Sequence, residues 1–391
     1  MRPFTVAIPQ AKLDAIAARV AAFAWFPAPD DEPDGASPQG WARGVNTATL
    51  KDLCAYWLER FDWRAAEAAL NRHPQFIAEI EGLEVHFLHV VGEAEGRRPL
   101  LLTHGWPGAH YEFWDVIEPL AYPSRFGGSA KDAFDLVIPS LPGYGFSGRP
   151  ARPLGQRATA RLWNTLMTQV LGYPRYMAQG GDWGGLVTSW LGLDHGPACA
   201  AIHLNMIGLR PTPATPQTDA ERAWLAQTAQ RMQAGGAYFM QQATKPQTLA
   251  MALMDSPVGA AAWILEKLHG WSDLSGGGLW SVYSRDQILT LIMLYLVTDS
   301  MATGVWYYRA LFEENGGVGL PEGRRIETPT GFANFPGEGL YTAPPRSWAE
   351  RAYKVVSWRD MPRGGHFAAM EVPDLFVDEV RAFGRGWFAG G

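Results

Sequence analysis

The stretch that decides the fold is Arg175-Tyr-Met-Ala-Gln-Gly-Gly-Asp182-Trp-Gly-Gly-Leu-Val. A short apolar run leads into a polar residue flanked by glycines, and an apolar helix start follows. This pattern is typical of a nucleophile elbow, a sharp turn between strand and helix in which glycines relieve crowding and one side chain projects. The projected residue is Asp182, and the serine version of the motif, G-x-S-x-G, occurs nowhere in the sequence. The sequence therefore predicts an aspartate nucleophile.

A carboxylate at this position restricts the chemistry. It suits in-line attack on an sp³ carbon that carries a leaving group, which gives an ester between enzyme and substrate that water must then cleave. Epoxides and haloalkanes are substrates of this kind. The alternative is that Asp182 caps the following helix, since Asp is among the residues favoured at helix N-termini. On this stretch alone the two interpretations are evenly balanced.

Around the elbow, short apolar runs alternate with helix-like stretches, which is typical of a parallel α/β sheet. The strands are expected at residues 83–91, 99–103, 135–138, 175–178, 200–204, 328–334 and 354–357. Between 210 and about 323 this alternation is lost, and helical patterns take its place at residues 220–232, 244–269 and 285–312. We expect these helices to form a cap over the carboxyl ends of the strands, where open α/β sheets bind ligands.

These patterns predict the domain organisation. Helices separated by an exposed loop, residues 27–40, are expected between residues 8 and 61. The predicted segments are an N-terminal extension wrapping the core at 1–95, a first part of the core at 96–209, a helical cap at 210–323, and a second part of the core at 324–391.

Backbone donors for a negatively charged oxygen are expected next to the elbow. The strand at 99–103 runs into His104-Gly-Trp-Pro-Gly108, a loop at the place where elbow-type hydrolases supply one oxyanion N–H. The residue after the nucleophile supplies the other. The sequence therefore predicts the amides of Trp106 and Trp183 as the two donors.

A general base and its acidic partner are expected from the last two strands. His366, in Pro362-Arg-Gly-Gly-His366-Phe, follows the final strand and is the candidate base. The acid should follow the strand at 328–334, where Glu338 is the first carboxylate, and it would hold the imidazole ring. Asp360 and Glu371 are nearer to His366 in the sequence and stay open as alternatives.

One motif matches a nucleotide-binding pattern only in part. Gly143-Tyr-Gly-Phe-Ser-Gly148 fits the dinucleotide fingerprint G-x-G-x-x-G and follows an expected strand. No acidic residue occurs between positions 149 and 181, so the carboxylate that binds a ribose about twenty residues later is missing. We therefore interpret this segment as a turn-rich loop near the pocket.

The composition excludes several classes of partner. Hydrophobic residues make up 47% and charged residues 18% of the chain, which is typical of a globular protein. A formal net charge of -6 disfavours binding to nucleic acid or to an anionic membrane, because these partners need clustered Lys and Arg.

The cysteines and the apolar segments bear on location. Cys54 and Cys199 imply no disulfide framework, so a cytoplasmic location is expected. Charged residues interrupt positions 1–25 and the longest uncharged apolar run is 288–297, so we expect a soluble protein without a signal peptide or membrane span.

The motifs together resemble the microsomal-type epoxide hydrolases of the α/β-hydrolase fold, over nearly the whole chain. They are His104-Gly-Trp-Pro-Gly, Gly180-Gly-Asp-Trp-Gly-Gly, Ala243-Thr-Lys-Pro-Gln-Thr, Asp255-Ser-Pro-Val-Gly, Ile264-Leu-Glu-Lys, Pro329-Thr-Gly-Phe and Arg363-Gly-Gly-His-Phe-Ala-Ala, with Tyr56-Trp, Phe61-Asp-Trp, Leu70-Asn and residues 76–89 in the N-terminal segment. The resemblance implies a mostly parallel sheet with an inserted helical cap and an N-terminal extension.

The resemblance also implies roles for single residues. Asp182 matches the family's nucleophile, His366 its general base, and Glu338 its charge-relay acid. The family has two cap tyrosines that hold and protonate the epoxide oxygen, and the resemblance implies that Tyr238 and Tyr308 are these two residues. The second motif is altered, because Tyr307-Tyr-Arg-Ala310 has two adjacent tyrosines and lacks the usual acidic residue. Tyr307 therefore stays open as the alternative to Tyr308.

The resemblance implies conversion of epoxides to vicinal diols, with an epoxide and water as the only small-molecule partners and no metal or organic cofactor. Membrane-bound relatives carry an N-terminal anchor that this sequence lacks, and a homodimer is left open. The alternative within enzymes is a haloalkane or haloacid dehalogenase with the same Asp182 nucleophile. A non-catalytic receptor on this fold is disfavoured, because Asp182, Glu338 and His366 are all retained.

Overall fold

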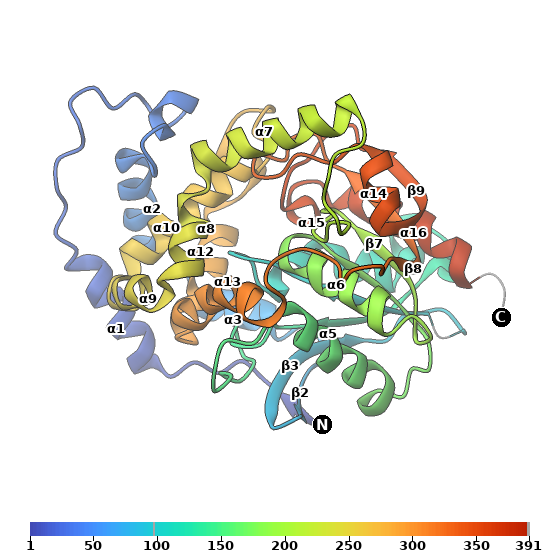
Figure 1. The fold of residues 1–391 in the computed structure, drawn as a ribbon. Coiled ribbons are helices and arrows are strands. Elements are labelled where there is room, and N and C mark those ends of the chain that lie inside the picture. The colour runs from blue at the N-terminus through green and yellow to red at the C-terminus, as the bar shows by residue number, and fades with distance from the viewer. Residues whose placement is uncertain (97, 389–391) are drawn as a thin grey trace.

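A mixed sheet lies at the centre of the computed structural model, which describes residues 1–96 and 98–388 (Figure 1). Over these residues the sheet has nine strands in the order β1-β2-β3-β5-β4-β6-β7-β8-β9. The strands are β1 (Arg2–Phe4), β2 (Gln75–Ile80), β3 (Leu83–Val90), β4 (Pro99–Thr103), β5 (Asp135–Pro139), β6 (Tyr176–Gly180), β7 (Cys199–Leu204), β8 (Ile326–Asn334) and β9 (Tyr353–Asp360). Pairing is antiparallel from β1 to β5 and parallel from there through β4 to β9.

The seven expected strands are present as β3 to β9, with bounds that shift by one to a few residues. Strands β1 and β2 were not expected. β1 has only three residues, and the burial along β2 does not alternate cleanly between faces. A very short strand, or one without alternating burial, carries little periodic signal. The first 90 residues thus contribute three strands to the sheet.

The helices cover both faces of the sheet and fill the insertion. They are α1 (Gln10–Ala21), α2 (Thr47–Glu59), α3 (Trp63–Leu70), α4 (Ile117–Ala121), α5 (Gln156–Thr165), α6 (Asp182–Asp194), α7 (Asp219–Gly235), α8 (Ala237–Thr244), α9 (Pro246–Asp255), α10 (Pro257–Trp271), α11 (Leu279–Val282), α12 (Arg285–Val297), α13 (Met301–Asn315), α14 (Arg346–Ala352), α15 (Ala368–Glu371) and α16 (Pro373–Phe388), with short turns η1 (Pro38–Trp41), η2 (His110–Val116), η3 (Pro123–Phe126) and η4 (Ala130–Asp132) and a π-helical turn η5 (Leu166–Val170).

The layers follow from the sequence of the central strands. β4, β5 and β6 are buried along their whole length, as expected for parallel strands covered on both faces. Helix α6 contacts β4, β6, β7 and β8 with α5 beside it, whereas α4 and α16 contact each other and pack on β5 and β7 (Figure 1). This α/β-hydrolase core brings the carboxyl ends of the strands to one edge.

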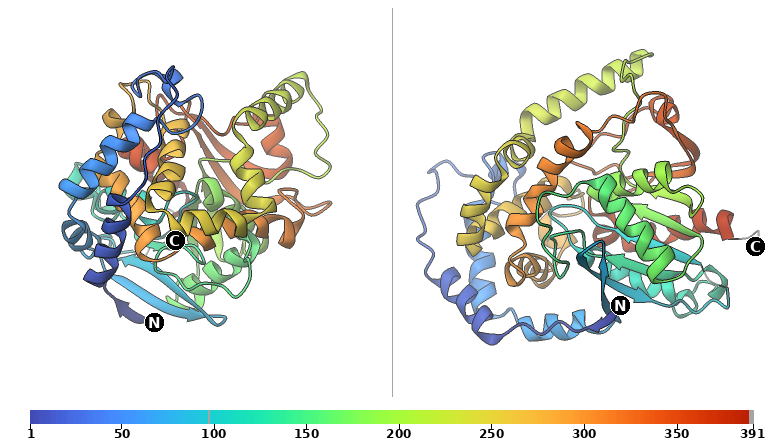
Figure 2. Two further views of the ribbon diagram at one scale, coloured as in Figure 1. Left: turned by 90° about the vertical axis from the view of Figure 1, so that its left-hand side faces the viewer. Right: turned by 60° about the horizontal axis from the view of Figure 1, so that its bottom comes forward.

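Within residues 210–323 lie helices α7 to α13, which form a separate layer beside the sheet (Figure 2). Two of the expected helical stretches are broken. α9 and α10 meet at 116° where Pro257 starts the second helix, and α12 and α13 meet at 85° around Asp299, whose φ is 55°. Among the described residues, no single helix is long and apolar enough to span a membrane. The two bent pairs together have the length and the apolar composition of a span, but each pair is broken by its bend.

The N-terminal segment runs from the sheet edge to the inserted helices (Figure 2). α1 and α2 both contact α10 and α12. The Trp41 ring stacks on the His269 ring of α10, with centroids 3.9 Å apart, and Arg285 of α12 pairs with Asp52 of α2. The segment therefore braces the inserted helices against the core.

Candidate active site

The elbow at Asp182 has the geometry that its glycines predict. Asp182 has a φ of 47°, in the left-handed region that costs a non-glycine residue about 1–2 kcal/mol. A Cβ on Gly180 would lie 2.2 Å from the Gly184 carbonyl oxygen, and one on Gly184 only 1.8 Å from that of Thr103. Helix α6 is capped by Gly181 without a side-chain bond, so the interpretation of Asp182 as a helix cap is wrong.

The loop after β4 reaches the carboxylate of Asp182. The Trp106 amide donates a hydrogen bond of 2.8 Å to Asp182 Oδ1, and a Cβ on Gly105 would lie 2.4 Å from that of Asp182. Trp183, whose amide is the second expected donor, opens helix α6, and its ring lines the neighbouring cavity. The close approach of this loop explains why a glycine precedes Trp106.

His366 connects Asp182 to one acidic residue. Its Nε2 lies 3.5 Å from Asp182 Oδ2, and its Nδ1 lies 2.7 Å from Glu338 Oε2. The other Glu338 oxygen accepts hydrogen bonds from the amides of Leu340 and Tyr341, at 2.9 and 3.2 Å. Asp182, His366 and Glu338 thus form one line of contacts at the carboxyl edge of the sheet.

The two alternative acids have other partners. Asp360 accepts a hydrogen bond of 2.9 Å from the side-chain amide of Asn334. Glu371 accepts from the amides of Asp273 and Phe367, each at 2.7 Å. Of the three acids considered, Glu338 alone contacts the ring of His366.

The electrostatics of the site favour a charged imidazole in the free protein. Burial opposes the charge, but the carboxylates of Glu338 and Asp182 outweigh it and hold the pKa of His366 well above 6.5. These attractions favour the imidazolium form of the ring. Removing the charge of either carboxylate would lower this pKa, because one of the two attractions would be lost.

Two phenols of the inserted helices line the same cavity as Asp182. Tyr238 of α8 stacks on the Trp106 ring at 5.5 Å, and Tyr308 of α13 meets the same ring edge-on at 5.5 Å. Their own ring centroids are 5.9 Å apart. Burial raises the pKa of both tyrosines well above 10, so both are protonated donors at neutral pH. The Tyr307 hydroxyl instead donates to Thr159 Oγ1 at 2.6 Å.

Two further tyrosines of the inserted segment are core residues with bonded hydroxyls. Tyr283 shares a hydrogen bond of 2.6 Å with Ser272, and Tyr295 donates to the carbonyl of Gly108 at 2.6 Å.

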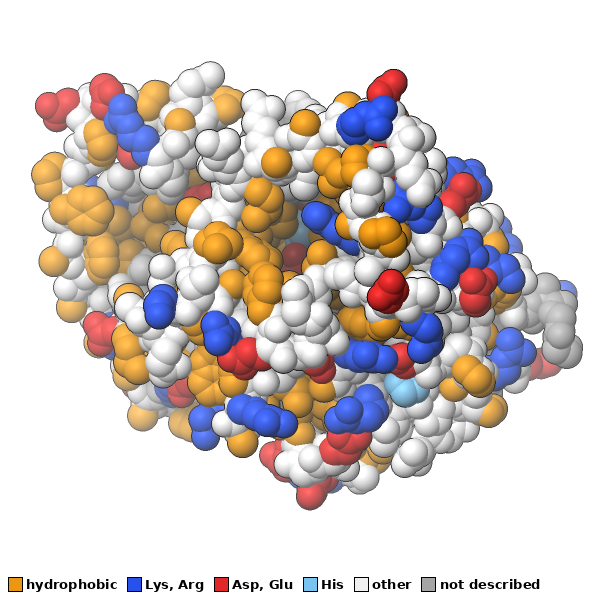
Figure 3. Space-filling model, viewed as in Figure 1, with side chains coloured by type: hydrophobic (Ala, Val, Ile, Leu, Met, Phe, Trp, Pro, Cys, Tyr) orange, Lys and Arg blue, Asp and Glu red, His pale blue; other side chains and the backbone are white. Residues whose placement is uncertain are grey.

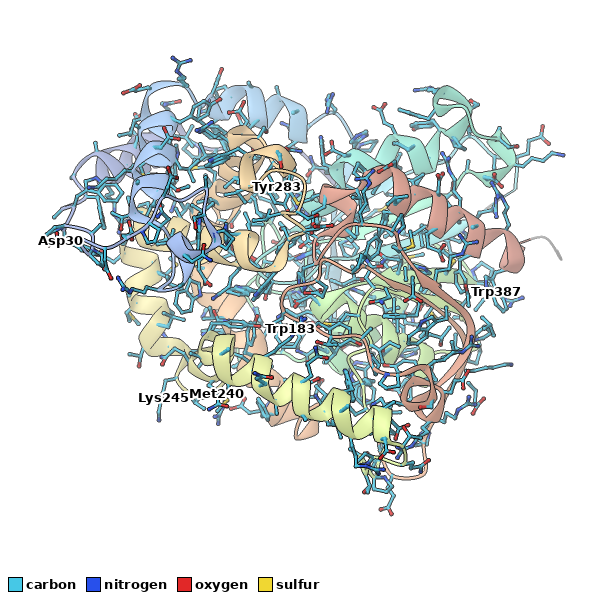
Figure 4. The ribbon with its side chains drawn as sticks, turned by 90° about the horizontal axis from the view of Figure 1, so that it is seen from above. Asp30, Trp183, Met240, Lys245, Tyr283 and Trp387 are labelled. Carbon is cyan, nitrogen blue, oxygen red and sulfur yellow. The ribbon has the colours of Figure 1, made fainter. Side chains whose placement is uncertain are left out.

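A cavity of about 480 Å³ extends from Asp182 and the two phenols between α7, α13 and the loop after β8. Figure 3 shows a hollow on this face with apolar walls, basic atoms on one side and acidic atoms at its floor. Trp183 lies in the interior, where the inserted helices meet the core (Figure 4). A second space of about 10 Å³, close to the room one water needs, is lined by Asp182, Asn205, Glu338 and His366.

Sequence reasoning missed contacts that join the inserted helices to the catalytic loops. The Trp271 carbonyl, at the end of α10, accepts the amides of His366 at 3.0 Å and Gly339 at 3.4 Å. Asp273 accepts the amide of Gly364 at 2.9 Å. These are mostly backbone contacts over long separations, which no local pattern marks. Both catalytic loops are therefore held by the end of one helix.

Sequence reasoning also missed Glu112, in η2. Burial raises its pKa to about 8, and the charge of Asp182 adds to the shift. Its Oε1 is buried without a partner among the described residues, and a Cβ on Gly108 would collide with it. In the sequence, Glu112 is an acidic residue in a short turn with aromatic neighbours, and nothing in this pattern indicates that its side chain is buried. In the part of the chain that is described, no cluster of three or more His, Cys, Asp or Glu side chains has the arrangement of a metal site.

Comparisons with known proteins agree over nearly the whole length. A family model described as epoxide hydrolase N terminus matches residues 1–113, and one described as alpha/beta hydrolase fold matches residues 98–253. Epoxide hydrolase 1 of Sus scrofa is 35% identical, over 98% of this chain and 88% of that protein. The structure of Aspergillus niger epoxide hydrolase is 34% identical with a TM-score of 0.83, over 99% of this chain and 96% of that one. The structure of juvenile hormone epoxide hydrolase from Bombyx mori is 29% identical with a TM-score of 0.82, over 99% and 94%.

Proposed function

This chain belongs to the epoxide hydrolase family of the α/β-hydrolase fold, and from this membership we propose that it converts epoxides to vicinal diols through an ester formed on Asp182. The observation that carries the mechanism is the line of contacts from Asp182 through His366 to Glu338, with two protonated phenols on the opposite side. A nucleophile, a base with its acid, and two proton donors are the groups that such a reaction needs.

The first step is ring opening. Asp182 Oδ1 is already engaged by the Trp106 amide, so Oδ2 forms the bond to an epoxide carbon while the C–O bond of the ring breaks. The released oxygen takes a proton from Tyr238 or Tyr308, because an alkoxide is too basic to leave unassisted. The products are an ester on Asp182 and a phenolate.

Formation of the ester prepares the base. The esterified Asp182 carries no charge, so one of the attractions that raise the pKa of His366 is gone. The imidazolium then gives its proton to restore the phenol. His366 becomes neutral at the stage at which a general base is required.

The second step is hydrolysis. His366 takes a proton from a water, for which the space of about 10 Å³ beside it has room, and the hydroxide adds to the carbonyl carbon of the ester. The amides of Trp106 and Trp183 stabilise the oxyanion, and Glu338 stabilises the imidazolium. When the tetrahedral intermediate collapses, the bond to the diol oxygen breaks. This oxygen then takes the proton of the regenerated Asp182 carboxyl group. The balance is one epoxide and one water for one diol, with no electron transfer.

A single-turnover reaction in oxygen-18-labelled water tests the ester. With enzyme in excess, we expect the first diol to be unlabelled, because its new oxygen comes from Asp182, and one labelled oxygen to stay in the Asp182 peptide. Direct attack of water on the epoxide would label the diol and leave the peptide unlabelled. Mass spectrometry of both products distinguishes the two routes.

The alternative is a dehalogenase that uses the same nucleophile. Halide release needs N–H donors that face the leaving group, and the indole N–H groups of Trp106 and Trp183, which are buried without a partner among the described residues, are the candidates for that role. The paired phenols suit an alkoxide better than a halide. An assay for halide release from a haloalkane panel, alongside diol formation, discriminates the two activities.

A further inference from the structure

The cavity beside Asp182 has one charged feature that the proposed mechanism does not use. Its walls are mostly apolar and aromatic, and Arg210 lies among them together with Asp182 and Tyr308. Arg210 follows β7, in the segment that leads into α7. Basic atoms are visible in the wall of the hollow on this face (Figure 3). A charged guanidinium is unusual among apolar side chains, because burial there removes water that stabilises the charge.

The position of Arg210 is fixed by its surroundings. Its amide donates to the carbonyl of Val318 at 2.8 Å, and its carbonyl accepts from the amide of Leu320 at 2.9 Å. The chain that enters the inserted helices is thereby joined to the chain that leaves them. The guanidinium carbon lies 5.9 Å from the centroid of the Trp224 ring of α7, within the range of a cation–π contact. The backbone of Arg210 is thus held by one segment and its side chain by another.

Arg210 has no acidic partner in the described chain. No carboxylate of residues 1–96 or 98–388 pairs with its guanidinium, and the neighbours that favour its charge are the Trp224 ring and the phenol of Tyr341. Burial lowers the pKa of Arg210 from its ordinary value. Arg351, farther along this face, pairs with Glu221 instead. The charge of Arg210 is therefore partly removed from water and not neutralised.

A partly buried cation without a carboxylate partner loses hydration that a ring face and a neutral phenol replace only in part. Resting on the proposed epoxide hydrolysis, we propose that Arg210 binds the carboxylate of an anionic substrate, so that the preferred substrates are epoxy carboxylic acids. A guanidinium takes a carboxylate through two parallel charge-assisted hydrogen bonds. With the oxirane at Asp182 and the carboxylate at Arg210, the apolar walls of the cavity face the hydrocarbon between them.

A chain-length series of terminal epoxy carboxylates and their methyl esters tests this assignment. We expect kcat/KM of the acids to pass through a maximum at the chain length that spans from Asp182 to Arg210, and to exceed that of the matching ester there about tenfold or more. The esters have no such preference, since they offer no charge. This comparison uses the unaltered protein, so it does not depend on the folding of a variant.

Variants give the second measurement. Arg210→Met keeps the side-chain stem over Trp224 and removes the charge, so the acid-to-ester ratio should fall to about one through a higher KM for the acids. Arg210→Lys should restore part of the ratio. Arg222→Met is the matched control, because Arg222 is exposed on α7 and pairs there with Asp219.

The outcomes separate the two proposals. Diol formation from the esters without preference for the acids, or equal losses for both in Arg210→Met, overturns the role of Arg210 and leaves the hydrolase intact. Absence of diol from every epoxide in the series overturns both. A ratio that falls in Arg210→Met but not in Arg222→Met supports the carboxylate site.

Discussion

Tyr307 and Tyr308 are neighbours on α13, yet their side chains enter different surroundings. The Tyr307 hydroxyl donates to Thr159 in the core at 2.6 Å, whereas Tyr308 lines the cavity and meets the Trp183 ring at 4.6 Å. Consecutive helical positions point about 100° apart, so only one of two adjacent tyrosines can face the carboxylate. The geometry therefore supports Tyr308 as the second proton donor.

Replacing Tyr308 by Phe removes one of the two donors. We expect Tyr308→Phe to slow ester formation about tenfold or more, and the double variant with Tyr238→Phe to slow it by about 10²–10⁴, the usual contribution of a general acid. Rapid-quench mass spectrometry measures the step. Tyr307→Phe is the matched control: it should lose about 1 kcal/mol of stability and keep the rate. Equal slowing in Tyr307→Phe and Tyr308→Phe would contradict the assignment.

Replacing His366 should separate the two chemical steps. His366→Gln removes the base for hydrolysis but leaves Asp182, so an ester adduct with the mass of the substrate should accumulate on the Asp182 peptide. Asp182→Ala serves as the control and should form neither adduct nor diol. Turnover of Asp182→Ala at the wild-type rate, or an adduct on another residue, would exclude Asp182 as the nucleophile.

The raised pKa of His366 predicts a pH dependence. Because the folded-state pKa lies above 6.5, the charged ring stabilises the fold fully below pH 6.5, and this stabilisation is lost as the pH rises through the folded-state pKa. Glu338→Gln removes the strongest attraction, so burial should then bring the pKa down. NMR titration of the ring measures the change, with Asp360→Asn as a control that should leave the pKa unaltered. An unchanged pKa in Glu338→Gln would contradict the coupling.

Glu112 predicts a pH dependence of the same sign, but here it is the neutral form of the side chain that the fold favours. Burial raises its pKa from 4.5 to about 8, so the folded protein binds this proton more tightly and stability falls as the pH rises through that interval. Glu112→Gln keeps the shape without the charge. Its melting temperature should exceed that of the wild type at about pH 9, and the difference should shrink at about pH 6. Scanning fluorimetry measures both, and Glu322→Gln, an exposed site, should have no such dependence.

Local pattern was enough for the core of the fold and for the turn at Asp182. The glycines around Asp182 are required by contacts of 2.2 and 1.8 Å that a Cβ would make, so the turn is encoded in residues adjacent in sequence. The buried strands β4, β5 and β6 are continuous apolar runs. The order of elbow, acid and base along the chain then predicted that Glu338 and His366 lie at the carboxyl edge of the sheet. The distance of 2.7 Å between Glu338 Oε2 and His366 Nδ1 agrees with that expectation.

Features that depend on distant partners could not be predicted. β1 exists because it pairs with β2, some seventy residues later. Arg210 is distinguished by the absence of a counter-charge around it in the part of the chain that the structure describes, and only the fold reveals which carboxylates are near. Tyr307 and Tyr308 are equivalent in sequence, and the helix phase that separates them depends on the break at Asp299.

The contact of the Trp271 carbonyl with the amides of His366 and Gly339 has a consequence for protein engineering. Because one residue of α10 supports both loops, the cap is not an interchangeable module. A chimera that grafts the helices of a relative onto this sheet keeps both loops in place only if the carbonyl at the end of the corresponding helix occupies the position of the Trp271 carbonyl. Substrate range in this scaffold is therefore better altered by changes within the cavity walls than by exchange of whole segments.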